Sequence, residues 1–105
     1  MASPWLPEGA EAALCLTFDD GLASQLKLAV PLLEKYGFNG TFYLNPNGAD
    51  WAERLLPWAM ASRRGHELGN HTVNHPCSRN FSFTAEHEGI EGLNLEAMER
   101  EIAEA

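Results

Sequence analysis

Basic residues and cysteines are scarce in this sequence of 105 residues, and each scarcity excludes a class of protein. Seven lysines and arginines stand against fifteen aspartates and glutamates, which gives a formal net charge of −8. Nucleic acid is not expected as a partner, because phosphate binding needs clustered Lys and Arg. Two cysteines, Cys15 and Cys77, are too few for a disulfide framework. They are also expected to lie too far apart to pair if the motifs described below share one site.

Long apolar runs and a secretory leader are missing as well. The apolar stretches are short and are interrupted by Lys27, Pro31 and Glu34, whereas a membrane span takes ~20 apolar residues. The first eight residues have neither a basic start nor an apolar middle, so no signal sequence is visible. We therefore expect no membrane association and a cytoplasmic location.

The negative charge is concentrated near the C-terminus. Residues 86–104 contain seven glutamates and only one lysine or arginine, Arg100. We interpret them as a solvated helix face and an acidic loop, with a functional acidic patch as the alternative. His87 lies among these glutamates and is expected in the solvated loop.

What the sequence does contain is the composition and patterning of one small α/β domain. Hydrophobic residues make up 45% and aromatic residues 10%, which is ordinary for a globular protein. Three apolar runs predict strands, at residues 12–16, 40–44 and 66–70. Helix signals occupy residues 29–36, residues 51–64 with a break at Pro57, and residues 94–105. Strand–helix–strand units pair in parallel, so we expect about three parallel strands with flanking helices, preceded by an extended or flexible segment at residues 1–11.

Two motifs carry the chemistry. Asp19 and Asp20 follow the first predicted strand where it breaks at Gly21, and His71 and His75 follow the third. Adjacent carboxylates are costly to keep ionised together unless a positive charge lies beside them, and a divalent cation would supply it. Histidines four residues apart on a helical turn would point toward one ion.

One carboxylate and two imidazoles form a three-ligand face with open coordination positions. Such a face is typical of a catalytic ion, because a structural ion has all its positions filled by protein. The second carboxylate would then be free to act as a base.

The segments 17–21 (TFDDG), 40–44 (GTFYL) and 65–76 (GHELGNHTVNHP) together resemble the polysaccharide deacetylase family with the NodB-homology fold. This resemblance implies metal-dependent hydrolysis of N-acetyl groups on amino-sugar polymers or oligomers, with an N-acetylated glycan as substrate. It implies Asp19 as the catalytic base, and Asp20, His71 and His75 as ligands of a divalent metal, with Zn²⁺ the leading ion. The implied fold is a (β/α) barrel of the NodB-homology type, present here in incomplete form.

The barrel of that family is about twice this long, and its second half carries further motifs: an Arg-x-Pro-Tyr segment, an Asp-Trp pair and a Leu-x-His with the general acid. None of them follows Pro76 in this sequence. Residues 1–105 are therefore expected to be the N-terminal portion of a single such domain. The alternative function is an inactive metal-binding half-domain that needs a second chain, since an unpaired sheet edge favours self-association or a completing chain.

Two further interpretations stay open. The motifs could cap strands in a purely structural α/β protein, or the site could hydrolyse a cyclic amide, although the Asp-Asp-Gly form favours sugar substrates. Four other residues are expected in packing roles: His66 beneath the site, Tyr43 in the core, and Trp51 and Trp58 between helix and sheet.

Overall fold

The computed structural model describes residues 6–84 and 89–105. Along the chain the elements are β1 (Thr17–Phe18), a π-helical segment (Gln25–Ala29), α1 (Val30–Lys35), β2 (Thr41–Leu44), α2 (Trp51–Leu55), α3 (Trp58–Arg63), β3 (Glu67–Asn70), a 3₁₀ turn (Ile90–Gly92) and α4 (Leu95–Ala103). The predicted α/β class is confirmed. His87 and two of the C-terminal glutamates, Glu86 and Glu88, lie outside the described residues, and so does the expectation of a solvated loop there.

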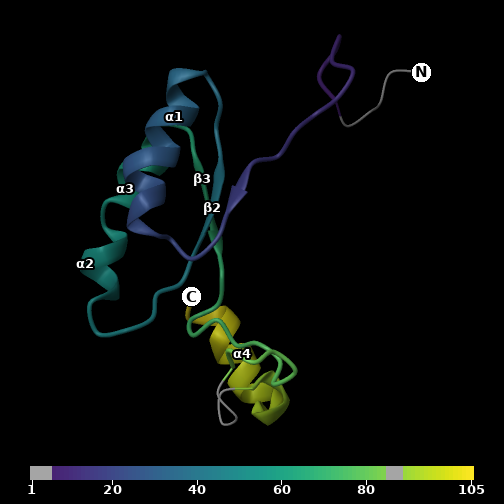
Figure 1. The fold of residues 1–105 in the computed structure, drawn as a ribbon, viewed down its shortest axis with the longest axis vertical. Coiled ribbons are helices and arrows are strands. Elements are labelled where there is room, and N and C mark those ends of the chain that lie inside the picture. Colours follow the sequence, from purple (N-terminus) through teal and green to yellow (C-terminus); the bar gives the residue numbers. More distant parts are fainter. Residues whose placement is uncertain (1–5, 85–88) are drawn as a thin grey trace.

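The three strands form one parallel sheet in the order β1-β2-β3. Thr17 pairs with Thr41, and Thr41 pairs with Glu67, so the three strands run in step. The helices α1, α2 and α3 lie on one side of the sheet, and α4 lies beyond the end of β3 (Figure 1). The parallel sheet of three strands was predicted from the sequence, whereas its closure into a barrel stays a prediction.

Local sequence signals explain where the helices begin and end. The helix predicted from residue 29 begins earlier, because helical backbone already runs from residue 23 through the π-helical segment into α1, so Pro31 lies inside this stretch; Gly37 follows the helix at φ +73°. Pro57 separates α2 from α3, as expected. Asn94 caps α4 by accepting a hydrogen bond from the Ala97 N–H at 2.8 Å.

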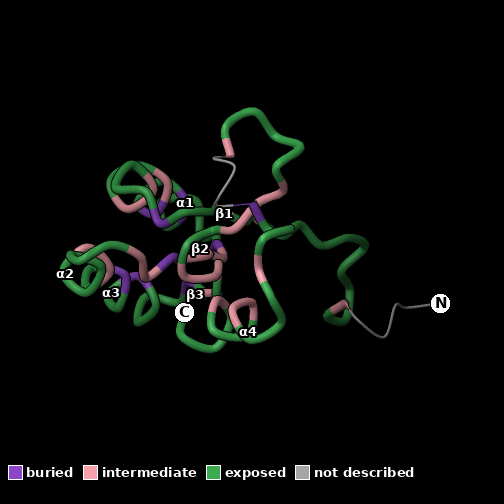
Figure 2. Tube along the Cα trace, turned by 90° about the horizontal axis from the view of Figure 1, so that it is seen from below, coloured by how far each residue is buried: buried purple, intermediate pink, exposed green. Residues whose placement is uncertain are grey.

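A small core lies between the helices and the sheet. Its buried members come from α1, β2 and α3: Val30, Leu33, Phe42, Trp58 and Ala61. Figure 2 shows the buried segments facing one another across these elements, while most of the remaining trace is exposed. The expected packing of Trp58 between helix and sheet is confirmed, whereas the same expectation for Trp51 is wrong, because that side chain is 48% exposed.

The apolar run at residues 12–16 does not form the buried strand that the sequence predicts. The strand begins only at Thr17, and the Leu14 side chain is 81% exposed. β1 is an edge strand of the sheet, and the described residues 11–15 before it are all exposed. Hydrophobicity alone cannot bury a segment that has no neighbour.

The molecule exposes more surface than its size requires. Its accessible area is 8013 Å², whereas a compact monomer of 11.6 kDa would expose about 5,800 Å². The radius of gyration is 17.0 Å, against about 13 Å for a compact domain of this length. Within the described residues no helix is long and apolar enough to span a bilayer.

His66 belongs to a polar cluster at the amino ends of β2 and β3. Its Nδ1 accepts a hydrogen bond from the Gly40 N–H at 3.1 Å, and its Nε2 lies 3.3 Å from Glu34 Oε1. Arg64 donates to the same carboxylate at 2.6 Å, and this bond, more than any other contact, lowers the pKa of Glu34. The side chain of His66 is fully buried and packs edge-on to Phe42, so the expected packing role is confirmed, but His66 lies at the opposite end of the strands from Asp20, His71 and His75 and not beneath them.

The pKa of a second carboxylate, that of Glu91, leads to a prediction of how stability depends on pH. Glu91 accepts hydrogen bonds from the Ser78 hydroxyl and from the Arg79 N–H, and these bonds lower its pKa to about 2, the hydroxyl contributing most. A lowered pKa in the folded state means that the contact stabilises the fold above pH 4.5 and loses this effect as the pH falls from 4.5 to about 2. An NMR titration of the Glu91 carboxyl carbon should show a midpoint near 2, and Ser78→Ala should raise it. A midpoint at the ordinary value in the unsubstituted protein would contradict this arrangement.

Candidate metal centre

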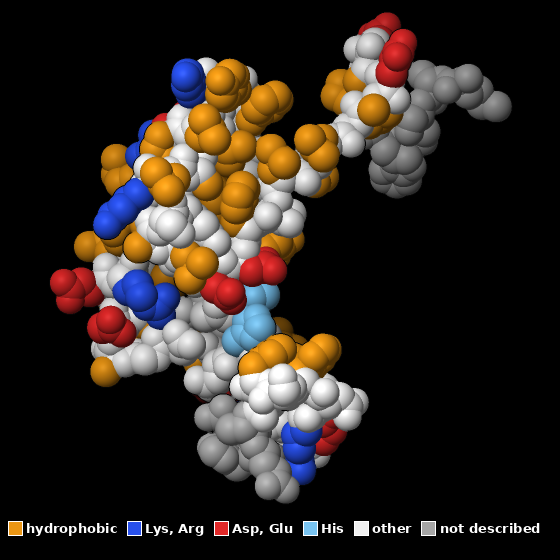
Figure 3. All heavy atoms as spheres, viewed as in Figure 1, with side chains coloured by type: hydrophobic (Ala, Val, Ile, Leu, Met, Phe, Trp, Pro, Cys, Tyr) orange, Lys and Arg blue, Asp and Glu red, His pale blue; other side chains and the backbone are white. Residues whose placement is uncertain are grey.

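The candidate ligands gather at one edge of the sheet because parallel strands bring their carboxyl ends together. Asp20 lies two residues after β1, and His71 comes directly after β3. His75 ends the loop that begins at His71. Acidic and histidine side chains lie together on this part of the surface, between the sheet and α4 (Figure 3).

Three side chains offer ligand atoms that all lie within 4.8 Å of one another: Asp20, His71 and His75. Asp20 Oδ1 is 3.3 Å from His71 Nε2 and 3.6 Å from His75 Nε2. The two imidazole rings meet edge to face with their centroids 4.6 Å apart. Residues more than fifty positions apart in the sequence therefore form one convergent donor set.

One ring nitrogen of His71, Nε2, has no hydrogen-bond partner among the described residues. This Nε2 is buried and makes no hydrogen bond within residues 6–84 and 89–105, and its nearest acidic neighbour is Asp20 Oδ1 at 3.3 Å. A buried polar atom without a partner costs about 1–3 kcal/mol. A cation held by the two imidazoles and the carboxylate would satisfy this atom, so the donor set fits a metal ion.

Backbone strain is concentrated at the same place. Among the described residues, the non-glycine positions with positive φ are Asp20 (+74°), Thr72 (+61°) and His75 (+53°). Left-handed backbone costs about 1–3 kcal/mol at such positions and persists only where the surroundings enforce it. Two of these three residues, Asp20 and His75, are candidate metal ligands, so the strained backbone orients side chains of the candidate site.

Gly21 makes the turn after the aspartates. It adopts φ +58°, and a Cβ there would lie 2.9 Å from Leu44 Cδ2 and 3.7 Å from Trp58 Nε1. Only glycine combines that backbone conformation with that close approach. The turn formed by Asp19, Asp20 and Gly21 therefore packs closely against the core.

Asn45 holds the histidine loop from the side of β2. Its buried side chain donates from Nδ2 to the carbonyl oxygens of His71 and Thr72. Arg54 in turn donates to the Asn45 carbonyl at 3.0 Å, and the His71 N–H donates to the Leu44 carbonyl at 3.1 Å. Asn45 is not among the candidate residues predicted from the sequence; its position directly after β2, at the same end of the sheet as the candidate ligands, is the signal that points to it.

Asp19 and Tyr43 flank the ligand group without belonging to it. Asp19 immediately precedes Asp20 and is exposed, and it is not a member of the three-residue group. The Tyr43 ring lies over Gly69 of β3, with its centroid 6.2 Å from that of the His71 ring. Tyr43 is only half-buried, so the expectation that it belongs to the core is wrong.

A pocket of 520 Å³ adjoins His75, between the histidine loop and α4. Cys77 also lines it, and both Cys15 and Cys77 are free, which confirms that they do not pair. The volume falls within the range of about 300–1,000 Å³ that is usual for small-molecule sites.

Comparison with known proteins agrees with this geometry. The chain matches the polysaccharide deacetylase family over residues 7–105, and it belongs to that family. It is also similar to a protein of Bacillus subtilis (strain 168) named "Uncharacterized protein YlxY", with 36% identity over 52 residues. That match covers 49% of this chain and 15% of the relative, so the aligned part is a small fraction of the longer protein. No solved structure matches the chain significantly.

Proposed function

We propose that this protein contributes the metal-binding half of a hydrolytic site that removes acetyl groups from N-acetylated glycans. The observation that carries the proposal is the convergence of Asp20 Oδ1 on the Nε2 atoms of His71 and His75, at 3.3 and 3.6 Å. Membership of the polysaccharide deacetylase family supports the substrate class.

Asp20, His71 and His75 would hold the ion. One carboxylate oxygen and two imidazole nitrogens suit Zn²⁺, and a three-residue set leaves a coordination position open, as in catalytic zinc sites. Zn²⁺ supplies Lewis-acid chemistry at such a site, polarising a carbonyl oxygen and making water a better nucleophile near neutral pH.

Asp19 is the proposed general base. It stands next to a ligand but outside the ligand group, so its carboxylate stays available for a proton. Taking the proton of the attacking water contributes typically ~10²–10⁴-fold to a rate. The pocket beside His75 would hold part of the glycan.

A second candidate function is favoured by the exposed edge of the sheet. β1 has a free side, Leu14 is 81% exposed, and the accessible surface exceeds that of a compact domain. In this second candidate, the chain binds metal but hydrolyses nothing until strands from a second chain complete the sheet. The proton donor for the departing amine would then come from the completing part.

The two candidates are separated by measuring zinc content and acetate release on the same purified chain. We expect about one retained Zn²⁺ per chain, and acetate release from N-acetylglucosamine oligomers if the site is complete. Asp19→Asn should keep the zinc and lower acetate release by ~10²–10⁴-fold, because only the base is removed.

Asp50→Asn is the matched control, since Asp50 is exposed at the start of α2 and makes no capping hydrogen bond with its side chain. Zinc without acetate release in the unsubstituted chain would favour the second candidate. Loss of zinc in Asp19→Asn would show that the roles of the two aspartates are assigned wrongly.

A further inference from the structure

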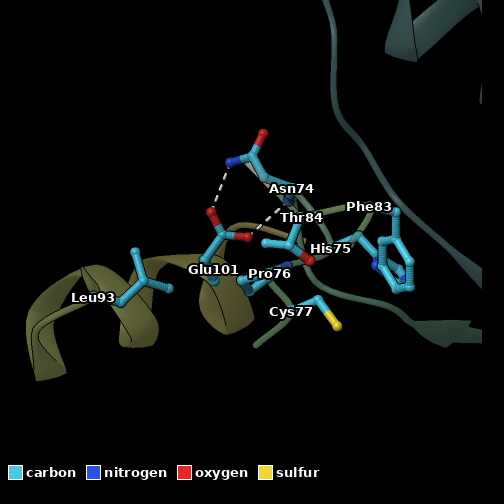
Figure 4. A pocket seen from close by; sticks show the side chains of 8 residues that line it. All are labelled: Asn74, His75, Pro76, Cys77, Phe83, Thr84, Leu93 and Glu101. Carbon is cyan, nitrogen blue, oxygen red and sulfur yellow. Dashed lines mark hydrogen bonds between the residues drawn. The ribbon is translucent and has the colours of Figure 1, made fainter. Parts of the chain in front are cut away.

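The C-terminal part of α4 is bonded to the loop that carries both histidines. Glu101 accepts hydrogen bonds from the Asn74 backbone N–H at 2.7 Å and from Asn74 Nδ2 at 2.6 Å. Its carbonyl oxygen accepts from the Val73 N–H at 3.0 Å, and the Ile102 carbonyl accepts from Asn70 Nδ2 at 2.7 Å. Figure 4 shows the Glu101 carboxylate facing Asn74 in the wall of the pocket, with both carboxylate contacts drawn.

The loop leaves none of its N–H groups unpaired between the two histidines. The five acceptors, in order from His71 to His75, are the Leu44 carbonyl, Asn70 Oδ1, the Glu101 carbonyl, Glu101 Oε2 and Thr72 Oγ1. Two of these five acceptors belong to Glu101, which lies on a different element from the ligands. Asn45 holds the carbonyls of residues 71 and 72, so four consecutive residues of the loop are fixed from outside it.

A carboxylate is needed at this position because both of its oxygens accept. Hydrogen bonds to a charged acceptor are about twice as strong as neutral ones. A glutamine would present one oxygen and one NH₂ group, and the NH₂ group would face an Asn74 donor. Glu101 is half-buried, whereas Glu96, Glu99 and Glu104 of the same region are exposed.

We propose that Glu101 is a positioning residue for the metal site. It fixes the peptide groups of Val73 and Asn74, and these lie between Thr72 and His75, both of which are held at positive φ. Releasing them lets the strained loop relax and moves the two imidazoles apart. The inference rests on the proposed metal site and adds a residue that does not belong to the three-residue ligand group.

The test compares zinc affinity in the full chain, Glu101→Gln and Glu99→Gln, using competition with a chromophoric chelator. We expect Glu101→Gln to bind Zn²⁺ about 10-fold more weakly, the lower end of the range for groups that orient metal ligands. Glu99→Gln makes the same change of charge on an exposed position of α4 and should bind within about twofold of the full chain. The visible spectrum of bound Co²⁺ should change in Glu101→Gln alone, because the spectrum reports ligand geometry.

Asn74→Ala tests the same contact from the loop side if Glu101→Gln disturbs α4. It removes the 2.6 Å bond to Glu101 Oε1 and leaves the helix sequence intact. The effects of the two substitutions on zinc affinity should fall short of additive in the double variant. Unchanged zinc affinity and an unchanged Co²⁺ spectrum in a folded Glu101→Gln or Asn74→Ala variant would overturn the positioning role. Absence of zinc binding by the unsubstituted chain would instead overturn the proposed metal site, and this inference with it.

Discussion

His71→Ala should remove zinc binding from the folded chain. The substitution deletes one of three ligand atoms that converge within 4.8 Å, and it leaves Asp20 and His75 as an incomplete pair. Loss of a group that merely orients a ligand costs ~10–100-fold in metal affinity, so loss of the ligand itself should cost more than ~100-fold. Metal analysis after dialysis should find about one Zn²⁺ per unsubstituted chain and almost none in the variant.

Cys77→Ser is the matched control for this prediction. A thiolate is a good zinc ligand, and Cys77 lines the pocket beside His75 but lies outside the ligand group. The serine variant should keep its zinc. Equal zinc in the His71→Ala and unsubstituted proteins would refute the site, whereas loss of zinc in Cys77→Ser would add a sulfur ligand to it. Removing His71 should also leave the far-UV circular dichroism unchanged, because its side chain lies outside the core.

The outline of the fold and the grouping of Asp20, His71 and His75 could be predicted from short motifs in the sequence. Pro57 and Gly37 mark helix boundaries through their own backbone restrictions, and the strands follow from apolar runs between turn residues. The parallel order of the strands then brings Asp20 and His71 to one edge. The helix and strand assignments need only the residue and its neighbours in sequence, whereas the grouping at one end of the sheet also needs the parallel pairing of the strands.

The supporting contacts of the site could not be predicted, because they join segments distant in sequence. Asn45 reaches the His71 carbonyl across 26 positions, and Glu101 reaches Asn74 across 27. Nothing in the acidic C-terminal segment distinguishes Glu101 from the glutamates around it until α4 is placed against the loop. The prediction that residues 12–16 are buried is wrong for the same physical reason, since the exposure of Leu14 depends on which distant segments pack beside it.

Phe42→Ala should strongly destabilise the fold. Phe42 is fully buried in the central strand, and its ring centroid lies 4.8 Å from that of Phe18 and 4.9 Å from that of Trp58. Removing a buried phenylalanine ring costs about 3–5 kcal/mol, against a total stability of about 5–15 kcal/mol for ordinary domains. Thermal unfolding followed by circular dichroism should show the midpoint lowered by more than ~10 °C, or no cooperative transition.

Phe38→Ala removes the same atoms from a position that is 57% exposed, so its free energy of unfolding should change by about 0.5 kcal/mol or less. Equal destabilisation by the two substitutions would show that the core is not centred on β2. The Phe42 substitution also reaches the metal centre, because Asn45 directly follows β2 and holds the His71 carbonyl. A chain that loses the packing of β2 should therefore lose its zinc affinity together with its cooperative unfolding, although Phe42 belongs to the core and not to the ligand group.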